Sequence, residues 1–328
     1  MPKASLAEIF SALRGGESFL VTSHPSPDGD AVGSTLCVYH LLRALGKQEI
    51  VCVNDDPIPR IYSWLPGGDQ IVQTSALSSR VRASIVIVVD AASKIRVGRV
   101  GELVEPTAQW VMIDHHLDER STGDLVFVDS TYSAVGEILI ELFEESGVAL
   151  SREAAACAYV SIVTDTGGFR YANTTPRSHR IAARLLETGI DAAEISSRVF
   201  DLMSAPKFEM LRRVLDRTQR IAEGRVAYSM LTARDAQETT ARGEDVNGLI
   251  NFPRNIEGVE VGILFREVGP GTTKVSMRSR NTFNCAAFLE QLGGGGHAGA
   301  AGATLEMPLA EARRMVLERI RAALGDSA

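Results

Sequence analysis

The segment SIVIVVD, residues 84–90, is an unbroken run of aliphatic residues, mostly β-branched, between a serine and an aspartate. A run of this kind suits a strand that is buried on both faces, as in a parallel sheet with helices on either side. Further strands are predicted at SFLVTS, EIVCVN, QWVMID and DLVFVD, residues 18–23, 49–54, 109–114 and 124–129. Helical periodicity is present at about 5–15, 31–45, 133–147 and 151–164. This alternation predicts an α/β domain built on a parallel sheet with helices on both faces.

The rest of the chain has a different pattern. Helices at about 176–189, 191–201 and 205–220 are followed by the strands RVAYSML, VEVGILFREV and TKVSMRSR, residues 225–231, 259–268 and 273–280. A short helix, CAAFLEQL, then precedes GGGGHAGAAGA, residues 293–303, and an amphipathic helix begins near Pro308. We therefore expect a first domain over residues 1–185, a helical linker over 186–222, and a smaller α/β domain over 223–328.

Charge and cysteine usage limit the partners and the compartment of the chain. A net charge of −7 over 328 residues argues against coating of long duplex nucleic acid by phosphate neutralisation. No stretch reaches the ~18 apolar residues of a membrane span, and the N-terminal segment has no apolar signal-peptide core. We therefore expect a cytoplasmic protein without a membrane partner. Its cysteines match no metal or disulfide spacing and are expected to be reduced and buried: Cys37, Cys52, Cys157 and Cys285.

Acidic residues and histidines follow several of the predicted strands at their carboxyl ends. Asp90 closes the 84–90 segment, and the other residues of this kind are His24, Asp28, Asp30, Asp114, His115 and His116. Ligands of an open parallel sheet bind outside the carboxyl ends of the strands, so these side chains should share one crevice. Carboxylates that share a site resist ionising together unless a cation or a shared proton lies between them. The pattern therefore indicates a metal site.

The expected ligand set combines imidazole nitrogens with carboxylate oxygens: His24, Asp28, Asp30, Asp90, His115 and Asp165. Such a set suits Mn²⁺, Mg²⁺, Fe²⁺ or Zn²⁺ and exceeds the needs of one ion. It fits two ions about 3.5 to 4 Å apart, the arrangement used for in-line displacement at phosphorus, with Asp90 as the natural bridge. Each acid also has a simpler explanation, in which Asp30 caps a helix, Asp28 lies in a turn and Asp90 ends a strand.

The glycine-rich segment 293–303 has two interpretations. It is either a flexible linker or a loop whose backbone N–H groups, together with His297, hold a phosphate. The preceding strand is locally basic through Lys274, Arg278 and Arg280. Arg278 is expected to bind a second or terminal phosphate of the substrate, whereas Arg280 is as readily a solvated strand end. Arg170, directly after the Asp165 motif, is a further candidate for phosphate contact.

These motifs in this order resemble those of the DHH phosphoesterase superfamily: SHPSPDGDAVGS, VVD, IDHH and VTDTGGFRY. The segments VSMRSR and GGGGHAGAAG resemble the C-terminal substrate-binding domain of one of its branches. Within that branch the chain is most similar to the bifunctional oligoribonucleases and 3′-phosphoadenosine 5′-phosphate phosphatases. The resemblance covers essentially the whole chain.

The resemblance implies a role for each matched residue. One ion, usually Mn²⁺, would be bound by His24, Asp28 and Asp90, and the other by Asp30, Asp90, His115 and Asp165. Asp114 would orient a neighbouring histidine, and His116 would contact the scissile phosphoryl group. The distal part of the substrate would be held by Arg278, Ser279, Gly295, Gly296 and His297. Homodimerisation is also an expectation from the family.

The function expected from residues and resemblance together is metal-dependent hydrolysis of phosphate esters. The expected substrates are very short 5′-phosphorylated oligoribonucleotides, cleaved to mononucleotides, and 3′-phosphoadenosine 5′-phosphate, converted to AMP. One alternative is a phosphodiesterase for linear or cyclic dinucleotide messengers, which would need the same site chemistry. Another is a non-catalytic nucleotide sensor, which loss of a metal ligand would favour, and every expected ligand is present.

Overall fold

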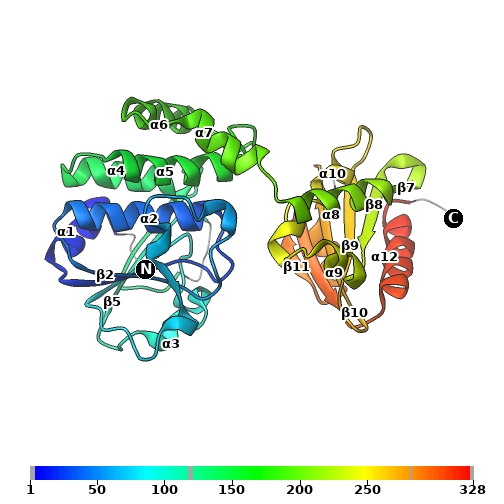
Figure 1. Cartoon of the computed structure of the whole chain (residues 1–328), viewed down its shortest axis with the longest axis horizontal. Coiled ribbons are helices and arrows are strands. Elements are labelled where there is room, and N and C mark those ends of the chain that lie inside the picture. The colour runs from blue at the N-terminus through cyan, green and yellow to red at the C-terminus, as the bar shows by residue number, and fades with distance from the viewer. Residues whose placement is uncertain (1–3, 117–120, 281–282, 326–328) are drawn as a thin grey trace. The chain divides into compact units, whose positions relative to one another are not determined.

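The computed structural model describes residues 4–116, 121–280 and 283–325 and divides the chain into two compact units, Met1–Leu202 and Met203–Ala328 (Figure 1). The division falls inside the range 186–222, where the sequence predicts a linker, and the chain there forms helices. Each unit contains one sheet of six strands with its own core.

The first unit is an α/β structure, as predicted. Its strands are β1 (Ser18–Thr22), β2 (Glu49–Asn54), β3 (Ile71–Gln73), β4 (Ile85–Val89), β5 (Gln109–Asp114) and β6 (Leu125–Val128). All pair in parallel in the order β3-β2-β1-β4-β5-β6. Its helices are α1 (Leu6–Gly15), α2 (Gly29–Ala44), α3 (Val100–Leu103), α4 (Val135–Ser146), α5 (Arg152–Asp165), α6 (Pro176–Glu187) and α7 (Ala192–Ser196). Short 3₁₀ turns include Lys94–Val97, and a π-helical turn spans Ser197–Asp201.

The two faces of this sheet are covered unequally. One face packs against the long helices, among them α2 and α4, and these lie in layers on one side of the sheet in Figure 1. The other face is covered by α3, the turn at Lys94–Val97 and adjoining loops. Helix α5 contacts α2 and α4 on one side and α6 and α7 on the other, which explains why it is apolar on nearly all sides.

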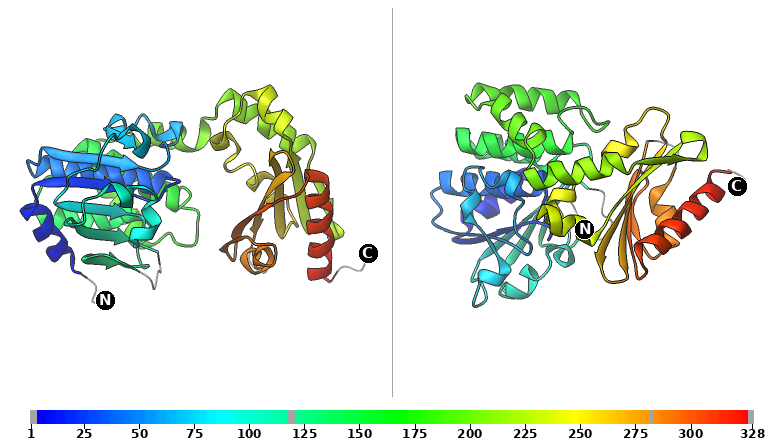
Figure 2. Two further views of the ribbon diagram at one scale, coloured as in Figure 1. Left: turned by 90° about the horizontal axis from the view of Figure 1, so that it is seen from below. Right: turned by 45° about the vertical axis from the view of Figure 1, so that its right-hand side comes forward.

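The second unit has a mixed sheet in the order β11-β12-β10-β9-β8-β7. Its strands are β7 (Gln219–Ile221), β8 (Val226–Leu231), β9 (Val261–Gly269), β10 (Thr272–Ser279), β11 (Gly295–His297) and β12 (Ala300–Leu305). Its helices are α8 (Ala205–Asp216), α9 (Ala233–Thr239), α10 (Asn251–Arg254), α11 (Cys285–Glu290) and α12 (Leu309–Ala323). Helices α11 and α12 cover one face of the sheet, and α12 is seen lying against it in Figure 2; α8 and α10 pack on the other.

The glycine-rich segment is not a flexible linker but part of the second sheet, and its binding of a phosphate stays a prediction. Gly295–His297 and Ala300–Leu305 form an antiparallel hairpin at the edge of the second sheet. A Cβ atom at Gly294 would lie 2.4 Å from the carbonyl oxygen of Gly302, and one at Gly296 would lie 2.5 Å from that of Ala300. The glycines are therefore required for close pairing of the two strands.

Helices α2, α4 and α5 meet at small residues, which brings the start of α2 close to α5. A Cβ atom on Gly33 would lie 2.5 Å from the carbonyl oxygen of Cys157. A Cβ atom on Gly136 would lie 2.3 Å from the hydroxyl oxygen of Ser161. Both helices therefore approach α5 at a distance that only glycine permits.

We expect Gly33→Ala to lower the free energy of unfolding by about 2 kcal/mol or more, because the added methyl group meets backbone of α5 that has no room to move. The comparison is Gly15→Ala in α1, where a Cβ atom would meet nothing within 4 Å. Urea titration of both variants measures the difference. Equal stability of the two variants would contradict the packing argument.

Candidate metal and phosphoesterase site

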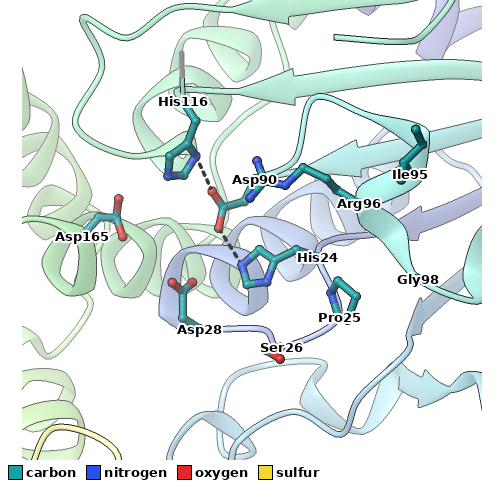
Figure 3. Close-up of a pocket in the computed structure, with 10 residues that line it drawn as sticks. All are labelled: His24, Pro25, Ser26, Asp28, Asp90, Ile95, Arg96, Gly98, His116 and Asp165. Carbon is teal, nitrogen blue, oxygen red and sulfur yellow. Dashed lines mark ion pairs between the residues drawn. The ribbon is translucent and has the colours of Figure 1, made fainter. Parts of the chain in front are cut away.

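The strand order brings the predicted site residues of the first unit to one place. β1, β4 and β5 are neighbours, and the chain runs outward from β1 to β3 on one side and from β4 to β6 on the other. A crevice forms at such a reversal of strand order, outside the carboxyl ends of the strands. His24 follows β1, Asp90 follows β4, and Asp114 ends β5. Figure 3 shows His24, Asp90 and His116 converging there, with Asp28 and Asp165 facing them.

A first group able to hold a metal ion consists of His24, Asp28 and Asp90, whose ligand atoms lie within 4.8 Å of one another. Nε2 of His24 lies 3.2 Å from Oδ2 of Asp90. Asp28 is also the N-cap of α2, because its Oδ1 accepts hydrogen bonds from the backbone N–H groups of Asp30 and Ala31. The capping role that the sequence analysis considered for Asp30 thus belongs to Asp28, whose second oxygen stays available for a cation.

A second group consists of Asp30, His115 and Asp165. Nε2 of His115 lies 3.4 Å from Oδ2 of Asp30 and 3.2 Å from Oδ2 of Asp165. The same nitrogen is 3.8 Å from Oδ1 of Asp90, so one carboxylate faces both groups with its two oxygens. Nδ1 of His115 lies 3.3 Å from the carbonyl oxygen of Tyr132. This contact leaves Nε2 as the nitrogen that can bind a metal.

Asp30 is fully buried and held in place by hydrogen bonds from three elements. Its Oδ1 accepts from the hydroxyl groups of Ser34 in α2 and Ser161 in α5. Its Oδ2 accepts from the backbone N–H of Val135 at the start of α4, at 2.9 Å. Because every contact comes from a well-packed helix, the carboxylate has little freedom to move.

Asp114 orients His116. It is buried, and its Oδ1 accepts from the backbone N–H groups of His115 and His116 and lies 2.9 Å from Nδ1 of the His116 ring. Nδ1 of His116 is also 3.3 Å from Oδ1 of Asp90. The hydrogen bond to Asp114 and the negative charge of Asp90 raise the pKa of His116 to about 11. His116 is therefore a positively charged group, with Nε2 left for a ligand.

The electrostatics of the site favour bound cations. Burial raises the pKa of Asp30 well above its usual range, and the neighbouring Asp90 and Asp165 raise it further. Burial opposes the charged form of His115, but Asp165 and Asp30 raise its pKa to about 9. Oδ1 of Asp90 and Nε2 of His115 are buried without a hydrogen-bond partner. Unpartnered buried polar atoms are costly, and divalent cations between the two groups would satisfy both of them.

The backbone at Asp90 has an unusual conformation, with a φ of 56°. This left-handed region is sparsely occupied by residues other than glycine, asparagine and aspartate. The turn there directs the carboxylate away from β4 and into the crevice (Figure 3). Such outliers are found at functional sites, where the surrounding packing maintains them.

The crevice is a pocket of about 520 Å³ lined by residues of both metal groups and by His116. Two further lining residues, Ile95 and Arg96, were not singled out from the sequence. They lie in the 3₁₀ turn Lys94–Val97, where the Ile95 side chain is 88% exposed. Arg96 brings a positive charge to a pocket otherwise rich in carboxylates. In the sequence, Arg96 could have been noticed as a basic residue that follows Asp90 closely, at the end of a predicted strand.

The residues predicted to hold the distal part of the substrate belong to the second unit. Ala300 pairs with Arg278 on one side and with His297 on the other, so Arg278 and His297 lie on one row across three strands. Gly295, Gly296 and His297 are exposed at the sheet edge. The buried Ser279 hydroxyl donates to the carbonyl oxygen of Phe283.

The other predictions have mixed outcomes. Arg170 is exposed beside the crevice-forming Asp165, and its Nε donates to the carbonyl oxygen of Gly167 while its guanidinium lies over Phe200. Phe169, the residue before Arg170, stacks on His179 within the protein, at 4.9 Å between ring centroids. The prediction for the cysteines is confirmed, because Cys37, Cys52, Cys157 and Cys285 are all buried and unpaired.

Comparisons with known proteins agree with this geometry. The N-terminal domain model of the DHH family matches residues 18–162, and the DHHA1 domain model matches residues 223–326. A Thermus thermophilus protein, "Bifunctional oligoribonuclease and PAP phosphatase NrnA", is 33% identical over 96% of this chain and 92% of its own length. The chain belongs to the NrnA-like group of the DHH family. The family predicted from the sequence is confirmed.

Two further proteins extend the comparison. A Bacillus subtilis protein with the same description is 25% identical over 91% of this chain and 92% of its own length. A crystal structure of an exopolyphosphatase-related protein from Bacteroides fragilis superposes with a TM-score of 0.88 at 25% identity, covering 98% of this chain and 97% of that one. Among the described residues, no helix has both the length and the apolar character of a membrane span.

For this DHH protein, we expect Mn²⁺ to raise the midpoint of thermal unfolding by about 5 °C or more relative to a chelator-treated sample, because a bound cation stabilises only the folded state. Asp165→Asn should reduce this rise, whereas the exposed Glu49→Gln should keep it. Differential scanning calorimetry measures the midpoints. The metal-site interpretation would be wrong if Mn²⁺ had no effect on the wild-type protein.

Proposed function

We propose that this protein is a metal-dependent phosphoesterase. Its proposed substrates are very short 5′-phosphorylated oligoribonucleotides, hydrolysed to mononucleotides, and 3′-phosphoadenosine 5′-phosphate, hydrolysed to AMP. The observation that carries the proposal is the pair of ligand groups at one crevice, both of which face Asp90. The names of the NrnA relatives support both substrate classes. They do not favour a dinucleotide-messenger phosphodiesterase or a sensor, and no expected ligand is missing.

The proposed cofactors are two divalent cations, with Mn²⁺ as the ion expected from the family. His24, Asp28 and Asp90 would hold one, and Asp30, Asp90, His115 and Asp165 the other. Bound there, the ions would supply an activated water nucleophile and neutralise charge that develops on the phosphoryl group. The mixed imidazole and carboxylate donors suit ions of this class and would not favour a thiophilic metal.

The protein's own groups would complete the reaction. His116, held by Asp114 and positively charged, would donate a hydrogen bond from Nε2 to the phosphoryl oxygens, and this contact would strengthen as charge develops. Asp114 acts as a positioning residue, since it touches the ring of His116 on the side away from Nε2. Arg278, Ser279, Gly295, Gly296 and His297 are proposed to hold a terminal phosphate, with Arg170 as a further phosphate contact. Homodimerisation and a cytoplasmic location stay predictions.

The direct test is Mn²⁺-dependent release of mononucleotide from a 5′-phosphorylated diribonucleotide. We expect chelator-sensitive release by the wild-type protein and loss of turnover in Asp90→Asn. His116→Ala should lower kcat at least about 100-fold, as expected for loss of one group that acts in the transition state. Glu49→Gln is the matched control for Asp90→Asn. Near-normal turnover of a folded Asp90→Asn protein would exclude the two-metal proposal.

Arg96 offers a second test of the pocket. If its guanidinium binds a substrate phosphate, Arg96→Gln should raise KM for 3′-phosphoadenosine 5′-phosphate about tenfold, with a smaller change in kcat. Arg14→Gln removes an exposed arginine near the end of α1, which precedes β1, whereas the crevice lies beyond the carboxyl end of that strand; this variant should leave KM unchanged. Initial rates over a range of substrate concentrations measure both constants. An unchanged KM in Arg96→Gln would mean that this residue makes no substrate contact.

A further inference from the structure

The second unit contains a small cavity whose lining is basic. The cavity has a volume of about 90 Å³ and lies on the sheet face formed by the middle of β9 and β10. Its charged lining residues are Arg266, Lys274 and Arg278, and no carboxylate lines it. Ser276 and Asn247 add neutral polar groups. The whole chain is acidic, so a cavity with this lining is a marked local exception.

Two of these positively charged side chains lie at positions where they do not stabilise the sheet. Lys274 of β10 and Arg266 of β9 are directly paired across the strands. Like charges in such a pair repel each other and destabilise the sheet. In the part of the chain that the structure describes, neither side chain forms an ion pair with a carboxylate. A local conflict of this kind is typical of a position kept for binding.

The surroundings of Arg266 increase the cost of its charge. The residue is half-buried, and burial lowers the pKa of its guanidinium. The charge has therefore lost part of its hydration without gaining an anionic partner from the protein. An external anion would relieve both this loss and the repulsion from Lys274.

The cavity continues toward the residues proposed to hold the terminal phosphate. Lys274, Ser276 and Arg278 alternate along β10 and so face the same side of the sheet. Ser276 pairs with Gly302, and Gly302 pairs with Gly295, so the floor beside the cations consists of small residues. Lys274 and Arg278 are four residues apart, about 13 Å along the strand. The spacing allows two separate phosphate groups on one face.

We propose that Arg266 and Lys274 form a second phosphate subsite, which binds an additional backbone phosphate of oligoribonucleotides longer than a dinucleotide. This inference rests on the proposed function and names the substrate feature that the subsite recognises. A bidentate guanidinium and a mobile ammonium group suit a phosphate diester, and Ser276 can donate a further hydrogen bond. A diribonucleotide or a bisphosphonucleotide has no phosphate to place there, so the subsite distinguishes substrates by length.

The test compares 5′-phosphorylated diribonucleotide and pentaribonucleotide as substrates of the full-length chain. In the double variant Arg266→Gln, Lys274→Gln we expect KM for the pentaribonucleotide to rise about tenfold, and KM for the diribonucleotide to change less than about twofold. The dependence of log KM on log salt concentration should become shallower by about 0.7 for the pentaribonucleotide, as expected for one lost phosphate contact. Arg266→Lys keeps the positive charge, so its KM for the pentaribonucleotide should stay close to the wild-type value.

The control is Arg319→Gln, which removes an exposed arginine from α12 on the opposite face of the sheet. Equal KM values for the pentaribonucleotide in the wild-type protein and a folded double variant would overturn the subsite. If the wild-type protein hydrolysed neither substrate, the proposed function would fail. Fluorescence anisotropy with labelled pentaribonucleotide would then test the subsite independently of catalysis. Unchanged affinity in the double variant would overturn the subsite, and weakened affinity would support it.

Discussion

The rest of the candidate site depends on the hydrogen bonds that the buried side chain of Asp30 accepts. This side chain joins α2, through Ser34, to α5, through Ser161, and to the first N–H group of α4, through Val135. A buried polar group is costly unless its hydrogen bonds are complete, so the three helices have to be packed in one arrangement. The close approach at Gly33 and Gly136 makes those bonds possible. The same packing sets where α2 begins and α5 ends, and therefore where Asp28 and Asp165 lie.

The carboxylates around the crevice make different structural contacts, although they lie close together. Asp28 caps a helix, Asp30 ties three helices together, and Asp114 holds a histidine ring. Asp90 differs in that its two oxygens face both ligand groups. Its Oδ1 is buried without a hydrogen-bond partner within the described protein, as are Oδ2 of Asp114 and Nε2 of His115. The scaffold thus satisfies most of the polar atoms and leaves unsatisfied those at the centre, where cations would bind.

Much of this arrangement could be predicted from the sequence, because it depends on local signals. The β-branched run before Asp90 indicated a buried central strand, and the order of strand ends indicated which acids and histidines would meet. What could not be predicted depended on distant contacts. The hairpin at Gly295–His297 contains too little side-chain surface to show strand alternation, and only its pairing with β12 reveals it. Arg96 and Arg266 gave no periodic signal, since their positions depend on how a loop and a neighbouring strand fold around them.

The left-handed backbone at Asp90 restricts which residues can occupy this position at all. Glutamate carries the same charge, but it adopts that backbone shape less readily and would extend its carboxylate one bond farther into the crevice. Asparagine and glycine fit the backbone but bring no charge. Aspartate is thus the residue that meets both demands, one set by the turn and the other by the cations. The turn after β4 therefore limits which substitutions position 90 can accept. Aspartate and glutamate are not interchangeable there, although both are acidic.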